Sequence, residues 1–143
     1  MGLQEPTLID AIMGTRGQID FLWQFFVTVQ IAVFALLLIY DEAVEGLSFL
    51  ARLMATAGIA LFDWINGKAL VSTYLLLDAM LEQYRALFGQ ADRFHPLFYD
   101  RFVQASFTDR PDIVQVTHGL AFAVVTIALF WRGFIQRRRK VTA

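Results

Sequence analysis

The sequence predicts an all-α membrane protein, organised as a single integral membrane domain over residues 1–143. Three observations predict this fold class. First, the stretches at about 20–40, 47–65 and 113–131 are long, apolar and nearly free of charge, and about 20 apolar residues in a helix span a bilayer. Second, 57% of the residues are hydrophobic, which is high for a soluble domain. Third, apolar residues recur at helical spacing over about 69–88, which predicts an amphipathic helix in addition to the three spans.

A short segment precedes the first span. Within residues 1–19, an apolar stripe predicts a helix of one or two turns at the membrane interface, ending before Gly14 and Gly17. A frayed tail is the alternative, because chain ends are often poorly ordered.

The span at about 20–40 carries no formal charge between its flanking acidic residues. Gln24 and Gln30 are the polar side chains of interest in it. A hydrogen bond between membrane helices stabilises their packing by roughly 0.6–2 kcal/mol. We therefore expect both glutamines to pack within the bundle of this chain, with a contact to another subunit as the alternative.

Small residues at a spacing of four predict close helix packing in the second and third spans. The pairs are Ala51/Ala55, Thr56/Ala60 and Gly119/Ala123. Small side chains at this spacing let the backbones of two membrane helices approach each other closely.

The second span, at about 47–65, contains two charged residues, Arg52 and Asp63. Both lie near the ends of the span, so we expect their side chains to extend toward the lipid headgroups. The alternative is that they line a polar path through the membrane, because ionisable residues inside a bilayer commonly mark such paths.

Asn66 and Gly67 predict a break after the second span, because this dipeptide is a frequent turn former. The helix at about 69–88 that follows either extends the second span or lies along the membrane surface. If the dipeptide is tolerated inside a helix, the two helices fuse into one rod. Aromatic and charged residues alternate over 89–112, which predicts an interfacial loop with a short helix.

The last helix has clear start signals. Asp109 can cap it, and Pro111 fits its first turn. His118 lies inside the span at about 113–131. A hydrogen bond from His118 to Gln24 or Gln30 is the leading interpretation, and ligation of a haem or chlorin is the alternative.

A basic tail covers residues 132–143 and includes Arg137, Arg138, Arg139 and Lys140. Because basic residues are enriched on the cytoplasmic side of membrane proteins, the tail predicts an outside N-terminus and a cytoplasmic C-terminus. The cluster can also attract anionic lipids.

The composition disfavours several function classes. The chain has no cysteine, so disulfides and thiolate metal sites do not arise. A net charge of −1 provides no field to attract nucleic acid. Motifs for nucleotide binding, hydrolysis or di-iron chemistry do not occur, so we expect neither enzymatic activity nor a bound cofactor.

The leading hypothesis is therefore a non-catalytic accessory or scaffold subunit of a larger membrane complex, or a homo-oligomer. Its partners would be the lipid bilayer and other membrane subunits or copies of itself. The three-span layout is common among small bacterial membrane proteins, so a bacterial inner membrane is the expected location. Two alternatives remain: an oligomeric pore or transport component lined by Gln30, Arg52, Asp63 and His118, and a haem- or pigment-binding subunit that uses His118.

Overall fold

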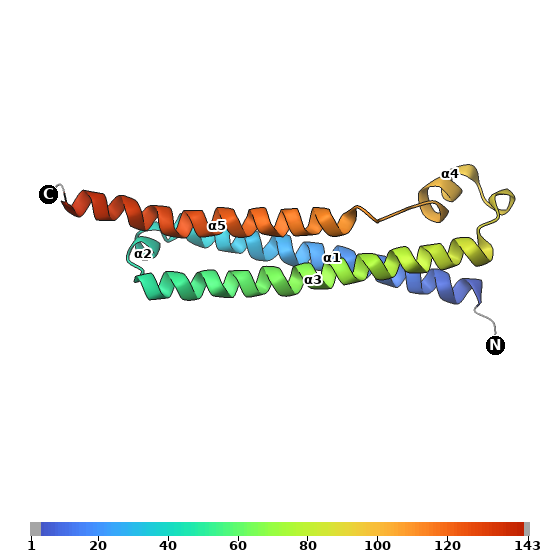
Figure 1. Cartoon of the computed structure of the whole chain (residues 1–143), viewed down its shortest axis with the longest axis horizontal. Coiled ribbons are helices and arrows are strands. Elements are labelled where there is room, and N and C mark those ends of the chain that lie inside the picture. The colour runs from blue at the N-terminus through green and yellow to red at the C-terminus, as the bar shows by residue number, and fades with distance from the viewer. Residues whose placement is uncertain (1–3, 142–143) are drawn as a thin grey trace. The chain divides into compact units, whose positions relative to one another are not determined.

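The computed structural model describes the backbone of residues 4–141 and the side chains of residues 4–40 and 42–131. Over this part of the chain, the structure is helical and contains no strand, which confirms the all-α prediction. In chain order, the elements are α1 (Glu5–Ile39), α2 (Asp41–Glu45), α3 (Phe49–Phe88), the 3₁₀ turn η1 (Ala91–Arg93), α4 (Pro96–Phe98), the π-helical turn η2 (Tyr99–Val103) and α5 (Arg110–Val141) (Figure 1). Three described segments, α1, α3 and Arg110–Trp131 of α5, are long and apolar enough to cross a membrane.

The first helix is longer than predicted, and the expectation of a short helix ending before Gly14 was wrong. α1 runs without interruption through Gly14 and Gly17. One glycine inside a helix costs about 1 kcal/mol relative to alanine. Burial of Leu8, Ile12 and Ile19 in a hydrophobic core offsets this cost.

The break predicted at Asn66 and Gly67 was also wrong, and the alternative of a single fused rod is confirmed. The two helices expected at about 47–65 and 69–88 are one continuous helix, α3, which has 40 residues and is about 60 Å long at the α-helical rise. Contacts with another helix outweigh the low helix propensity of the dipeptide. The Asn66 amide is buried and hydrogen-bonded, and Gly67 lies against the ring of His118.

Two compact units make up the chain. The first unit comprises Met1–Trp23 and Lys68–Val114, and the second comprises Gln24–Gly67 and Gln115–Ala143. Each long helix contributes one part to the first unit and another part to the second.

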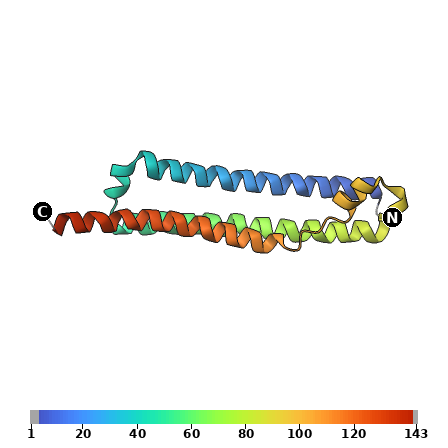
Figure 2. The same ribbon diagram turned by 90° about the horizontal axis from the view of Figure 1, so that it is seen from above.

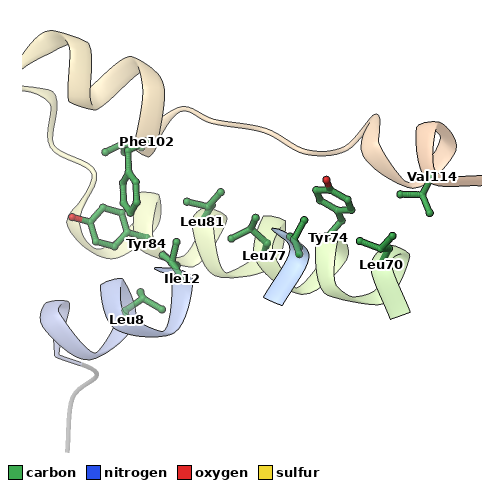
Figure 3. Close-up of a cluster of buried hydrophobic side chains, with 11 residues drawn as sticks. Leu8, Ile12, Leu70, Tyr74, Leu77, Leu81, Tyr84, Phe102 and Val114 are labelled. Atoms are coloured by element: carbon green, nitrogen blue, oxygen red, sulfur yellow. The ribbon is translucent and has the colours of Figure 1, made fainter. Parts of the chain in front are cut away.

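The core of the first unit gathers apolar side chains from α1, α3, η2 and the start of α5. Its buried residues are Leu8, Ile12, Ile19, Leu70, Tyr74, Leu77, Leu81, Tyr84, Phe102, Val103 and Val114 (Figure 3). Those from α3 recur every three or four residues, which places them along one side of the helix. Phe102 lies over Tyr84 on the side opposite α1, at a ring distance of 5.9 Å (Figure 3).

Hydrogen bonds at both ends of this core hold the segments together. Tyr84 Oη donates to Glu5 Oε1 at 2.8 Å, and Arg93 pairs with the other oxygen of Glu5 at 3.1 Å. At the opposite end, Trp23 Nε1 donates to Tyr74 Oη at 3.0 Å. The first turns of α1 are thereby fixed to the second half of α3.

The loop predicted over 89–112 contains short helical turns, as expected. Within it, the rings of Phe98 and Phe102 stack at 4.9 Å, and Phe107 N donates to Asp78 Oδ1 at 3.1 Å. α5 then begins at Arg110, directly after Asp109 and before Pro111, where the start signals placed it. Arg137, Arg138, Arg139 and Lys140 lie outside the residues whose side chains are described.

The second unit contains the end of α1, α2, the first half of α3, and α5. α2 forms a separate turn between α1 and α3, seen in teal in Figure 2. Within this unit, the end of α1 and α5 run in the same direction, and the first half of α3 runs opposite to them (Figures 1 and 2). The buried apolar residues of this unit are Leu37, Val44, Val125 and Leu129.

Candidate functional site

Among the described side chains, five polar ones are buried in the second unit, although the helices around them are apolar. They are Gln30, Arg52, Asp63, Asn66 and His118, and each is at most 6% exposed. Burying a polar group is costly unless it is hydrogen-bonded, and burying a charge is costlier still. The partners of these side chains therefore indicate what the second unit can do.

Arg52 binds backbone carbonyls on three segments of the second unit. Its Nη1 donates to Leu129 O on α5 at 2.7 Å. Its other nitrogens donate to Leu47 O at 3.2 Å, Val44 O at 3.2 Å and Glu45 O at 2.9 Å. The last carbonyls of a helix lack partners inside the helix and carry partial negative charge. The guanidinium thus stabilises the end of α2 and joins the α1–α3 connection to α5.

This geometry differs from the predicted extension of Arg52 toward the headgroups. The side chain is 6% exposed and directed into the unit. Because a guanidinium has five N–H donors in a rigid plane, it can serve several carbonyls that a lysine could not reach together.

Asp63 and Gln30 form a buried pair between α3 and α1. Gln30 Nε2 donates to Asp63 Oδ1 at 2.8 Å. Both side chains are 6% exposed. The remaining oxygens of the pair, Asp63 Oδ2 and Gln30 Oε1, are buried and have no hydrogen-bond partner among the described residues. Asp63 therefore also turns inward, and the pairing of Gln30 within the chain follows the leading sequence interpretation.

His118 and Asn66 form a second buried pair, between α5 and α3. His118 Nε2 lies 2.9 Å from Asn66 Oδ1. An amide oxygen only accepts hydrogen bonds, so Nε2 is the donor. The ring of Phe26 on α1 stacks on the imidazole at 3.9 Å, and a Cβ added at Gly67 would lie 3.5 Å from the ring. An alanine methyl group at position 67 would therefore fit in ordinary contact with the ring, whereas a larger side chain would meet it.

The partner of His118 is Asn66, which the sequence did not indicate. The expected partners were Gln24 and Gln30. Instead, Gln24 is exposed and Gln30 binds Asp63. Asn66 was read as part of a turn. Its three-residue spacing from Asp63, which places both on one face of a helix, was the available signal.

The small residues predicted for helix packing fall into two groups. Ala51, Thr56 and Ala60 are partly buried, whereas Ala55, Gly119 and Ala123 are exposed. A Cβ added at Gly119 would meet nothing within 4 Å. The exposed group does not pack closely within the part of the chain that the structure describes.

The site residues do not form a metal-binding cluster. Over the described residues, no group of three or more His, Asp or Glu side chains could hold a metal ion. Comparison with protein families, with curated proteins and with solved structures finds no match to this chain. Function is therefore inferred from the contacts of the chain itself.

Proposed function

We propose that this chain is a non-catalytic integral membrane subunit that associates with other membrane chains through the outer faces of α3 and α5. The observation that carries the proposal is the exposure of Ala55, Gly119 and Ala123. These residues leave backbone accessible to a second helix, and close approach of backbones is a main source of affinity between membrane helices. Gly58, also exposed, extends the accessible part of α3.

The exposed apolar surface supports placement in a bilayer. Large hydrophobic side chains such as Ile31, Leu61 and Ile127 are about 60% exposed or more, and lipid is the solvent in which this exposure carries no penalty. The proposed location is a bacterial inner membrane. The proposed orientation has the N-terminus outside and the basic C-terminus in the cytoplasm, following the positive-inside rule. Chain connectivity across three spans then puts residues 1–19 and 67–112 on one side of the membrane.

The pore hypothesis has weaker support. Arg52 donates four hydrogen bonds to backbone carbonyls, so its guanidinium would have to leave four partners in order to line a path. The haem or chlorin hypothesis has weaker support as well, because Nε2 of His118 is used by Asn66 and one ring face is covered by Phe26. Asp63 remains the polar group that the scaffold role does not account for.

Extraction in a mild detergent tests the proposal first. The complex should elute above the monomer size, and mass spectrometry should identify stoichiometric partners or the chain alone as a homo-oligomer. A monomer without partners, obtained under gentle extraction from native membranes, would refute the proposal.

A matched pair of substitutions locates the contact. Gly119→Leu fills the proposed interface without a clash inside the chain, and Gly17→Leu makes the same change at another site with open space around it. We expect Gly119→Leu to reduce association at least tenfold and Gly17→Leu to leave it unchanged. Equal behaviour of the two variants would contradict the assignment of this face.

Because the chain has no cysteine, a single Ala123→Cys substitution offers an independent check. Thiol crosslinking in membranes should join this position to the partner, provided that the partner also presents a cysteine. For a homo-oligomer, this condition is met by the second copy. Crosslinked product at Ala123→Cys and none at Gly17→Cys is the expected result.

A further inference from the structure

The two unpaired oxygens of the Asp63–Gln30 pair call for an explanation that the scaffold role does not provide. Gln30 Nε2 donates to one carboxyl oxygen of Asp63 at 2.8 Å. Asp63 Oδ2 and Gln30 Oε1 are both buried, and both lack a partner in the described part of the chain. Both acceptors belong to one hydrogen-bonded pair and neither has a donor, so a cationic or protic group would satisfy them.

Among the described side chains of the second unit, no positive charge is available to Asp63. Between residues 24 and 39, α1 has no charged residue, and from 115 to 131 the single titratable residue of α5 is His118. His118 directs Nε2 to Asn66. Arg52 is eleven residues away on the same helix, about 16 Å along its axis, and it is bound to backbone carbonyls. The ion pairs found among the described side chains do not include Asp63.

An ionised carboxylate in this position would be very unfavourable. A buried charge without a partner costs several kcal/mol even after relaxation, and the bilayer centre is no better a solvent for it. One neutral hydrogen bond from Gln30 does not offset such a cost. The carboxyl group must therefore be neutralised by a ligand.

A proton satisfies both open oxygens at once. A proton on Oδ2 turns Asp63 from an acceptor into a donor, and Gln30 Oε1 is the unfilled acceptor of the same pair. A carboxylic acid and a primary amide can face each other through two hydrogen bonds, N–H to carboxyl oxygen and O–H to amide oxygen. The first of these bonds is present in the structure at 2.8 Å.

A metal cation fits the pair less well. Hard cations such as Mg²⁺ and Ca²⁺ take about six to eight oxygen ligands, whereas the pair offers two unfilled oxygens. A proton bound to Asp63 Oδ2 needs only one acceptor oxygen, and Gln30 Oε1 is an unfilled acceptor.

We propose that Asp63 and Gln30 form a proton-binding site inside the membrane-spanning part of the chain, in which Asp63 Oδ2 holds a proton at neutral pH and donates it to Gln30 Oε1. The inference stands independently of the proposed scaffold role. Asn66 and His118, one turn further along α3, form the nearest polar pair on the same side of α3 through which such a proton could exchange.

Infrared spectroscopy of the full chain in lipid vesicles tests the site, because a protonated carboxyl group has a carbonyl stretching band distinct from that of a carboxylate. We expect this band at neutral pH in the wild type, a downshift of the band in D₂O, and its loss in Asp63→Asn. Asp78→Asn is the matched control: Asp78 lies on the same helix in the first unit, where it accepts a bond from Phe107 N. The control substitution should leave the band unchanged.

A second variant keeps the test decisive if Asp63→Asn does not fold. Gln30→Met retains Asp63 and removes both of its amide partners, so the band should move to higher frequency as the carbonyl loses its hydrogen bond. Absence of a protonated-carboxyl band that depends on Asp63 or Gln30 would overturn the proposal. Loss of the band on adding NaCl or LiCl at constant pH would overturn it in favour of a cation site.

Discussion

Replacement of a buried leucine on α3 by alanine should destabilise the first unit much more than the same replacement at its neighbour. Leu77 is 1% exposed and Leu76 is 52% exposed. The two residues share side chain, helix and sequence neighbourhood, so helix propensity changes equally in the two variants. Their difference measures burial alone.

The expected magnitude follows from the number of carbon atoms removed. Leucine to alanine deletes three carbons, and each buried methylene contributes about 0.8 kcal/mol, or about 2.4 kcal/mol in all. At Leu77, the cavity left between α1 and α3 raises the loss to about 2.5–5 kcal/mol. At Leu76, about half of the side chain is already exposed and no closed cavity forms, so we expect a loss of about 1 kcal/mol or less.

Trp23 provides an assay that reports on the first unit alone. Its indole donates to Tyr74, and the other two tryptophans, Trp64 and Trp131, belong to the second unit and are exposed. Replacing those two by phenylalanine leaves Trp23 as the single reporter. Denaturant titration in a mild detergent, followed by Trp23 emission, gives the free energy of unfolding of each alanine variant.

Two results would refute the reasoning. Equal free energies for the Leu77 and Leu76 variants would mean that the buried side of α3 is not the one shown in Figure 3. A larger loss at Leu76 would mean that the exposed side carries a contact from outside the chain, and hydrogen exchange on α3 would then show which surface is covered.

Three further substitutions test other contacts by the unfolding free energy in detergent. Arg52→Leu removes four hydrogen bonds to carbonyls and should lower the free energy of unfolding by about 3 kcal/mol or more. The control Arg85→Leu loses one bond within its own helix and should lower it by about 1 kcal/mol or less. Equal losses in the two variants would contradict the role of Arg52. Tyr84→Phe loses the bond to a glutamate that water can also reach, so it should cost about 1 kcal/mol, and no change would mean that this bond contributes nothing. Gly67→Ala adds a methyl group at an ordinary contact distance from the His118 ring and should stabilise α3 by about 0.5–1 kcal/mol. Gly67→Leu should destabilise it. A loss of stability in Gly67→Ala would show that the space between Gly67 and the ring is tighter than 3.5 Å.

Features that depend on local sequence could be predicted. Three long apolar helices are confirmed, because the length of a charge-free run is set by nearby residues alone. The start of α5 at Arg110 follows from Asp109 and Pro111 for the same reason. The residues that repeat along α3 from Leu70 to Tyr84 are buried together, since a spacing of three and four defines one side of any helix.

The continuity of α1 and α3 could not be predicted from such local rules. Gly14 and Gly67 are weak helix formers, but propensity is a small term that tertiary contacts override. For Gly67, the continuity of the helix depends on what lies opposite, whereas a Cβ at Gly14 would meet nothing within 4 Å. Opposite Gly67 is the His118 ring, which comes from a part of the sequence about fifty residues away.

Pairing of the buried polar groups was beyond the sequence for a geometric reason. Each residue turns a helix by 100° and advances it by about 1.5 Å. A polar side chain can therefore reach only those positions on an adjacent helix that face it at the same level along the helix axis. Gln30 therefore meets Asp63 and not His118, although both were plausible by composition. The same geometry places Asp63 beside an amide, and no ion pair of the described side chains includes it. The case for a bound proton thus depends on helix register, which places Gln30 opposite Asp63. The infrared test on Gln30→Met checks this pairing through the carbonyl band of Asp63.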